Sequence, residues 1–197
     1  MMRLASVTGQ ERGATDKLLA AVADRLAQDG VRLAGALRPS RNEAAVGHCD
    51  SDLWLLPEGP LVRITQDLGT CSGACRMDAG ALEVAVGMVT SRVQAGEADL
   101  VLLNKFGLSE AEGRGFRALI AEALDRGVPV LIGVSDTHRT AFERFAGDMA
   151  AHLPPDEDAL LAWCRSAVAP DATPTGARMR DPDGIPTGMR ATRAETT

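Results

Sequence analysis

The sequence predicts an α/β fold of three layers, in which helices cover both faces of a mainly parallel sheet. Short, continuous apolar runs alternate with longer runs of helical period over residues 1–168. The apolar runs are not interrupted by polar residues at every second position, which is typical of strands buried on both faces. With 45% apolar content, the 197 residues can fill the core of one such domain.

Each expected element follows from a local pattern. Compact apolar runs predict strands at 4–7, 31–37, 52–56, 61–65, 100–103 and 128–134. Runs with apolar residues three and four positions apart predict helices at 17–26, 80–93, 116–124, 140–145 and 158–167. The turn Pro57-Glu58-Gly59-Pro60 separates the third and fourth strands and predicts a β-hairpin inserted in the fold.

The composition changes after Ala169. Residues 170–197 are rich in Pro, Gly, Thr, Ala, Arg and Asp and show no apolar period. A segment of this composition cannot bury enough apolar surface to offset the entropy lost on ordering it. We therefore predict one domain over residues 1–168 and a disordered C-terminal tail over 169–197.

Charge and composition limit the partners. The formal charge is −6 and the pI about 5.1, and the chain has no long basic run and no tyrosine, so nucleic acid is not an expected partner. No run reaches the roughly 18 apolar residues of a membrane helix. The N-terminus enters a strand without a signal-peptide profile. We expect a cytoplasmic protein that does not bind membranes, and a homodimer is compatible with the sequence.

The first predicted strand leads into a degenerate phosphate-binding loop. P-loops read G-x-x-x-x-G-K-[ST], where the lysine holds the outer phosphates and the hydroxyl holds magnesium. Aligned on Gly9, this chain has Ala14 at the second glycine, Thr15 at the lysine and Asp16 at the hydroxyl. The sequence thus predicts the fold of a P-loop nucleotide hydrolase without its usual chemistry. Gly9, Gly13 and Thr15 are candidate ligand-binding residues.

A second candidate group follows the strand at 100–103. In P-loop enzymes a carboxylate at this strand end holds the metal, whereas this chain has Asn104, which can form hydrogen bonds but carries no charge. Lys105 can supply the positive charge that the first loop lacks. The pair is also similar to the guanine-binding signature N-K-x-D, although Gly107 stands in place of the aspartate. The alternative is that Asn104 fixes a turn and Lys105 is solvated.

Two glycines flank an arginine in the next segment. Gly113 and Gly115 weaken a helix by about 1 kcal/mol each, and they favour a loop that brings the Arg114 guanidinium close to an anion. The alternative is a flexible helix start with a solvated Arg114. Ser109 and Glu112 fit a capping box, which predicts a helix start at Ser109.

The loop before the second predicted helix supplies one more candidate. Asp78 is suited to cap that helix, and Arg76 either points at a ligand or pairs with Asp67 or Asp78. Ligands of open parallel sheets bind outside the carboxyl ends of the strands. We therefore expect the loops after the strands to form one ligand site together.

Cysteine and histidine residues predict a different kind of site. The hairpin brings His48 and Cys49 close to the loop that holds Cys71 and Cys75. Three thiols and an imidazole suit zinc or another soft metal ion, but the spacing is not that of a zinc knuckle and adjacent residues rarely reach one ion. Small, partly buried thiols with a surface histidine, or redox chemistry, are the alternatives.

Several segments resemble a known family. The runs 99–107 and 112–116, together with 66–69 and 75–78, are similar to a bacterial family of unknown function that is related to THEP-type P-loop nucleoside-triphosphatases. Genes of that family often lie near molybdate-transport genes. The resemblance covers about residues 2–165. It implies a P-loop-like sheet, a cytoplasmic setting and a role in molybdenum or metal homeostasis, and it does not carry over the hydrolases' catalysis.

Three functions remain open. The favoured hypothesis is a non-hydrolytic accessory or regulatory protein that binds a nucleotide or molybdate through Lys105, Arg114 and backbone amides, since a tetrahedral dianion suits a helix N-terminus. A divergent nucleoside-triphosphatase would use Lys105 or Arg114 in place of the missing lysine. A soft-metal or redox protein would use Cys49, Cys71 and Cys75.

Overall fold

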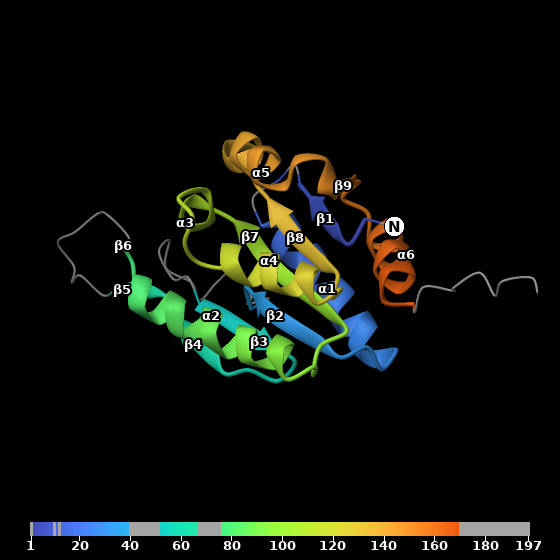
Figure 1. The fold of residues 1–197 in the computed structure, drawn as a ribbon, viewed down its shortest axis with the longest axis horizontal. Coiled ribbons are helices and arrows are strands. Elements are labelled where there is room, and N and C mark those ends of the chain that lie inside the picture. The colour runs from blue at the N-terminus through green and yellow to red at the C-terminus, as the bar shows by residue number, and fades with distance from the viewer. Residues whose placement is uncertain (1, 10, 12, 40–51, 67–75, 170–197) are drawn as a thin grey trace, which may run out of the picture.

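The computed structural model describes residues 2–9, 11, 13–39, 52–66 and 76–169. Its main sheet has seven strands in the order β4-β3-β2-β7-β8-β1-β9 (Figure 1). These strands are β1 (Leu4–Val7), β2 (Leu33–Leu37), β3 (Asp52–Leu56), β4 (Leu61–Arg63), β7 (Leu100–Phe106), β8 (Val130–Val134) and β9 (Ala150–Leu153). The short strands β5 (Thr65–Gln66) and β6 (Arg76–Met77) form a separate two-stranded sheet.

Five neighbouring strands of the main sheet are parallel. β2 pairs with β7, β7 with β8, and β1 lies between β8 and β9. β3 and β4 form an antiparallel hairpin at the other edge, with Leu53 opposite Val62. The predicted mainly parallel sheet with a hairpin insertion is therefore confirmed.

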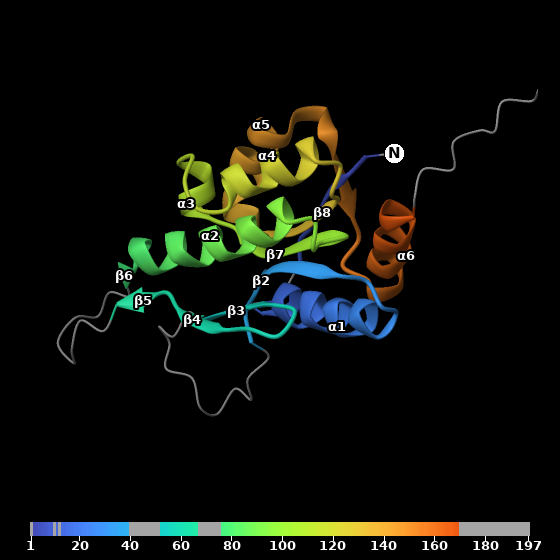
Figure 2. The ribbon, with the colours of Figure 1, turned by 60° about the horizontal axis from the view of Figure 1, so that its bottom comes forward.

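Helices cover both faces of this sheet. On one face lie α1 (Ala14–Gln28) and α6 (Glu157–Val168). On the other lie α2 (Ala79–Gln94), α4 (Arg117–Asp125) and α5 (Arg139–Ala146). Figure 2 shows the sheet between these two layers, with α1 and α2 on opposite sides. α3 (Leu108–Ala111) is a single turn after β7, and two short 3₁₀ turns, Asp136–His138 and Gly147–Met149, flank α5.

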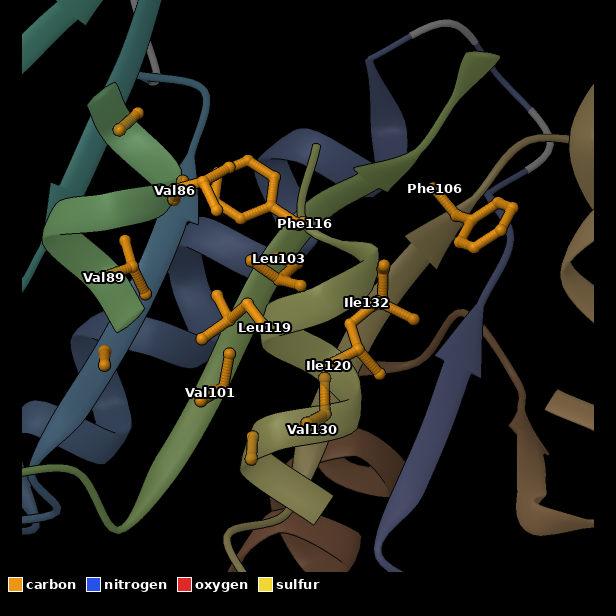
Figure 3. Packing of buried hydrophobic residues seen from close by; sticks show 14 of the residues in the cluster. Val86, Val89, Val101, Leu103, Phe106, Phe116, Leu119, Ile120, Val130 and Ile132 are labelled. Atoms are coloured by element: carbon orange, nitrogen blue, oxygen red, sulfur yellow. The ribbon is translucent and has the colours of Figure 1, made fainter. Parts of the chain in front are cut away.

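The central strands supply both hydrophobic cores, because successive residues of a strand point to opposite faces. In β7, Val101 and Leu103 belong to the core under α2 and α4, whereas Leu100 and Leu102 belong to the core under α1 and α6. Figure 3 shows the first core, in which Leu119 of α4 lies over β7. Full burial of each such side chain contributes about 1.5–3 kcal/mol, which explains why the apolar runs in the sequence are continuous.

The structure corrects several predicted strand boundaries. β2 and β8 each begin two residues later than expected, because the N–H groups of Val31 and Val128 donate to Leu26 and Ala123 at the ends of the preceding helices. The predicted strand 61–65 is divided between β4 and β5. β7 continues to Phe106, which is fully buried against α5, so Asn104 and Lys105 lie inside the strand and not after it.

β9 has no counterpart among the predicted strands. Its four residues, Ala150 to Leu153, are mostly small and only partly buried, and they pair with β1 alone. Ser6 of β1 and His152 add a side-chain hydrogen bond of 2.7 Å between Oγ and Nδ1. An edge strand held by pairing needs no long apolar run, so the sequence carries little signal for it.

Two helix starts differ from expectation, and a third agrees with it. α1 begins at Ala14 instead of residue 17. The predicted capping box of Ser109 and Glu112 is wrong, because α3 starts after Gly107 and the capping carboxylate is that of Glu110. The predicted cap of α2 is confirmed, since Asp78 Oδ1 accepts the N–H of Ala81 at 3.0 Å.

Among the helices of the described residues, none combines the length and the apolar content needed to cross a bilayer. The predicted tail lies outside the described residues except for Ala169, the C-cap of α6.

Candidate functional site

A cleft of about 830 Å³ opens at the carboxyl edge of the main sheet. It lies where β1, β2, β7 and β8 end and where their following loops begin. The structure brings together five of the sequence-predicted ligand-binding residues along its wall, namely Gly9, Gly13, Thr15, Asn104 and Lys105.

A second hollow, of about 560 Å³, lies at the opposite edge of the sheet, near Leu4. Its wall is apolar apart from Arg3, whose Nη1 donates to the carbonyl of Gly127 at 2.7 Å. The first cleft therefore offers far more polar chemistry to a ligand.

The loop between β1 and α1 is closed by a side chain from the first turn of α1. The N–H of Gly9 donates to Thr15 Oγ1 at 2.9 Å. A Cβ at position 9 would lie 2.7 Å from that oxygen, so the close approach requires glycine. Gly13 precedes α1 with a φ of 80°, a left-handed conformation that glycine adopts without strain. The Gly9 N–H group, which lies at the position of the first P-loop glycine, is thus already bonded to a threonine hydroxyl.

Thr15 also packs against the end of β8. A Cβ at Gly133 would lie 2.8 Å from Thr15 Cγ2 and 2.2 Å from the carbonyl oxygen of Asn104. A larger residue at position 133 would push the first loop away from β7 and β8. Gly133 therefore allows the two candidate loops to approach each other at the floor of the cleft.

Asp16 places a negative charge at the start of α1. Its Oδ2 lies 3.5 Å from Arg38 Nη1, and both residues line the cleft. A carboxylate in the first turn is favourable for the helix, whose N-terminus carries positive potential. In a working P-loop this positive potential stabilises a phosphate of the nucleotide. Here the Asp16 carboxylate places its own negative charge at the same end of the helix.

The end of β7 presents a neutral amide and a cation. Asn104 Oδ1 is buried and accepts no hydrogen bond within the described part of the chain. Lys105 is exposed and lines the cleft. An uncharged side chain at this strand end cannot give magnesium the carboxylate that P-loop hydrolases use. Together with Thr15 and Asp16, it makes the site a poor fit for a magnesium-bound triphosphate.

Glu110 is a buried residue that the sequence analysis did not single out. Its carboxylate accepts the N–H of Gly107 at 2.9 Å with one oxygen and the N–H of Phe116 at 3.1 Å with the other. The side chain thus ties both ends of the loop after β7, and the residue is only 4% exposed. The sequence did contain a signal for this role, because Glu110 follows Gly107 by three residues, as in a capping box. The competing pattern of Ser109 and Glu112 favoured a helix start two residues later.

Of the two remaining ligand-binding candidates, the structure describes the side chain of Arg114 and only the backbone of Arg76. Arg114 is 64% exposed at its side chain, forms an ion pair with Glu112 and is not part of the cleft wall. Arg76 lies in β6, opposite Gln66. The partner of Asp16 was not predicted either, because nothing in the spacing of positions 16 and 38 indicates that they meet.

The proposed metal ligands His48, Cys49, Cys71 and Cys75 all lie outside the described residues. Within the ranges that the structure covers, no three His, Cys, Asp or Glu side chains are arranged to hold a metal ion. The remaining cysteine, Cys164, is buried in α6, and this burial raises the pKa of its thiol to about 12. Cys164 is therefore a packing residue and not a thiolate at neutral pH.

Comparisons with known proteins agree with this architecture. Residues 4–163 match the family described as "Protein of unknown function (DUF2478)". Over 163 residues, 83% of the chain, the sequence is 31% identical to "Molybdenum import ATP-binding protein ModC 2" of Bradyrhizobium diazoefficiens. The match spans only 18% of that relative's length.

The fold is similar to the crystal structure of THEP1 from Aquifex aeolicus. The TM-score is 0.61 at 18% identity, and the match covers 85% of this chain and 99% of that one. The resemblance to a family of unknown function related to THEP-type P-loop proteins is thereby confirmed. At this identity the likeness to THEP1 establishes a P-loop fold and no activity.

Proposed function

The chain belongs to the DUF2478 family and has a P-loop fold, and from this premise we propose that it binds a nucleotide or another small anion without hydrolysing it. One observation carries the proposal. The loop after β1 lies where P-loop proteins bind phosphate, but Thr15 and Asp16 stand where hydrolases have lysine and a hydroxyl. The protein would then act as an accessory or regulatory component and not as an enzyme.

The lost groups are those that make phosphoryl transfer fast. Charge that develops on the transferred phosphoryl group is stabilised by the P-loop lysine and by magnesium. Here Thr15 is neutral, Asp16 is negative and Asn104 is neutral. Binding needs only complementary contacts, whereas cleavage needs groups that bind the transition state more tightly than the ground state. The cleft can therefore retain binding after losing cleavage.

A molybdenum-related setting is the second part of the proposal. It is supported by the name of the Bradyrhizobium relative, in which a segment similar to this chain is part of a longer molybdenum import ATP-binding protein. Molybdate is a dianion, and Lys105 is a cation on the cleft wall. Molybdate is therefore the alternative ligand to a nucleotide, and a cytoplasmic location would follow from either.

Calorimetric titration of the full chain tests the proposal. The ligands are adenine and guanine nucleotides, molybdate and tungstate, each with and without magnesium, and phosphate release is measured in parallel. We expect one ligand class to bind and the release of phosphate to stay at background. Lys105→Ala should weaken binding of an anionic ligand about tenfold, because a hydrogen bond to a charged group contributes about 1.5–3 kcal/mol.

The chain offers a matched control for this variant. The sequence has two lysines, and Lys17, which is exposed on α1, is not part of the cleft wall. Lys17→Ala removes the same charge and should leave binding unchanged. Acylation of the two amines, followed by mass spectrometry, should show ligand protection at Lys105 only. Magnesium-dependent phosphate release that falls in Lys105→Ala would instead establish a divergent nucleoside-triphosphatase.

A further inference from the structure

We propose that the cleft selects a nucleoside or a nucleoside monophosphate and disfavours the corresponding triphosphate and free oxyanions. This inference rests on the proposed function, because it names the ligand class for the same cleft. It follows from three features of the described residues, namely the hydrogen bonds inside the first loop, the charges on the wall and the apolar part of the wall.

Two backbone donors in the described part of the first loop and the start of α1 already have acceptors within the chain. The N–H of Gly9 donates to Thr15 Oγ1 at 2.9 Å, and the N–H of Ala14 donates to the carbonyl of Glu11 at 3.1 Å. In P-loops the backbone N–H groups of this segment point at the phosphates. An additional phosphate would have to displace the chain's own acceptors before it gained these donors.

The charges on the cleft wall oppose a highly anionic ligand. Among the residues that the structure describes, five acidic side chains line it, against two basic ones, Arg38 and Lys105. Asp16 already pairs with Arg38, so that guanidinium is partly neutralised. Each phosphate beyond the first adds negative charge near Asp16. Lys105 can neutralise the charge of one phosphate. The charges of the cleft therefore suit a monophosphate better than a triphosphate.

The described part of the wall carries acceptors beside the hydroxyls of Ser135 and Thr137. Carboxylates of Asp16 and Asp136 accept hydrogen bonds, and the amide of Asn104 has an oxygen that accepts none within the described residues. A turn of the Asn104 side chain would offer that oxygen to a ligand. The molybdate dianion has no hydrogen to donate to such groups, whereas ribose hydroxyls and the N–H groups of a base do donate to them.

The other part of the wall suits a planar ring. Leu53, Ile64, Leu82 and Phe116 line the cleft and are each between 5% and 8% exposed. They come from β3, the β4–β5 connection, α2 and the start of α4. A base placed against these side chains would bury its apolar surface away from water, and its sugar would lie toward the carboxylates.

The test is a titration series on the full chain with adenosine, AMP, ADP and ATP, repeated with the guanosine series. We expect the monophosphate or nucleoside to bind about tenfold more tightly than the triphosphate. Asp16→Asn should improve triphosphate binding about tenfold, because it removes the negative charge and keeps an oxygen that accepts a hydrogen bond. Asp24→Asn is the matched control, because Asp24 is an exposed carboxylate of the same helix and is not part of the cleft wall.

A measurement on the unaltered chain protects the test against a variant that folds poorly. Higher ionic strength screens repulsion between the cleft and a triphosphate, so triphosphate binding should strengthen with salt. Tighter binding of ATP or GTP than of the monophosphates would overturn this inference and leave the proposed function standing, and so would binding of molybdate alone. Failure of every nucleoside, nucleotide and oxyanion to bind would reject the proposed function itself.

Discussion

Two loops at the carboxyl edge of the sheet have backbone donors bonded to a side chain of the helix that follows, but the acceptors differ. In the loop after β1, the neutral hydroxyl of Thr15 accepts one N–H group, that of Gly9. In the loop after β7, the carboxylate of Glu110 accepts two, from Gly107 and Phe116. Thr15 is partly exposed, whereas Glu110 is 4% exposed.

This difference separates a loop that a ligand can open from a loop that it cannot. A neutral hydrogen bond contributes about 0.5–1.5 kcal/mol, whereas one to a charged group contributes about 1.5–3 kcal/mol. A ligand can therefore compete with Thr15 for the N–H group of Gly9 at a small cost in free energy. The Glu110 hydrogen bonds are too strong to displace and stabilise the fold. The residues that shape the cleft and the residues that a ligand can displace are thus different.

The largest effect is expected at Glu110. Glu110→Ala would leave two N–H groups without their charged acceptor and should lower the free energy of unfolding by about 3 kcal/mol. Urea denaturation followed by circular dichroism measures this change. Glu112→Ala is the matched control, because Glu112 is 46% exposed at its side chain and pairs with Arg114 at the surface; it should stay within about 0.5 kcal/mol. Equal effects of the two substitutions would contradict the role assigned to Glu110.

The next largest effect on stability is expected at the two glycines beside Arg114, and it should differ between them. Gly115 has a φ of 58°, and a Cβ there would lie 2.4 Å from Glu110 Oε1. Gly113 has a φ of 87°, but a Cβ would meet no atom within 4 Å. Gly115→Ala should therefore cost about 2–3 kcal/mol and Gly113→Ala about 1 kcal/mol. If denaturation midpoints fell equally, the Glu110 contacts would not constrain this loop.

A smaller change is expected in the first loop. Thr15→Val keeps the contact with Gly133 and removes the acceptor of Gly9, so the free energy of unfolding should fall by about 1 kcal/mol. Hydrogen exchange at the Gly9 amide should accelerate in the variant, while exchange at Phe116 stays unchanged. Unaltered exchange at Gly9 would show that Thr15 does not close the loop in solution.

The smallest effect is expected at the edge of the sheet opposite the cleft. The Arg32 side chain donates to Asp99 and holds the pKa of that carboxyl below its usual value. A depressed folded pKa stabilises the fold at neutral pH, and this contribution is lost as pH falls through it. Asp99→Asn should thus lower stability at pH 7 by less than about 1 kcal/mol, with no difference at strongly acidic pH. A difference that grew toward acid would refute the assignment.

The sequence predicted the central sheet because its strands are buried on both faces. Leu102 and Leu131 lie in one hydrophobic core, and the residues before and after them in each strand lie in the other. All of these positions are therefore apolar. β9 was missed because an edge strand of small residues gains its stability from pairing with β1, which no local pattern records. The extension of β7 was missed because Asn104 and Lys105 look like loop residues, although Phe106 beyond them is buried.

The position of the cleft was predictable, but its contacts were not. The rule for parallel sheets placed the site at the carboxyl ends of the strands, and the missing P-loop lysine was visible in the sequence. The pairing of Asp16 with Arg38 depends on the order of β1 and β2 in the sheet. The capping role of Glu110 depends on where α3 begins, which Ser109 obscured.

The place of β1 between β8 and β9 has a consequence for how the protein is made. Leu4 pairs with Val130 and also with Ala150, so β1 leaves the ribosome long before either of its neighbouring strands. Pairing across such a separation is slow, and exposed apolar strands are prone to aggregate meanwhile. A nascent chain of this protein should therefore depend on chaperones until Leu153 has emerged.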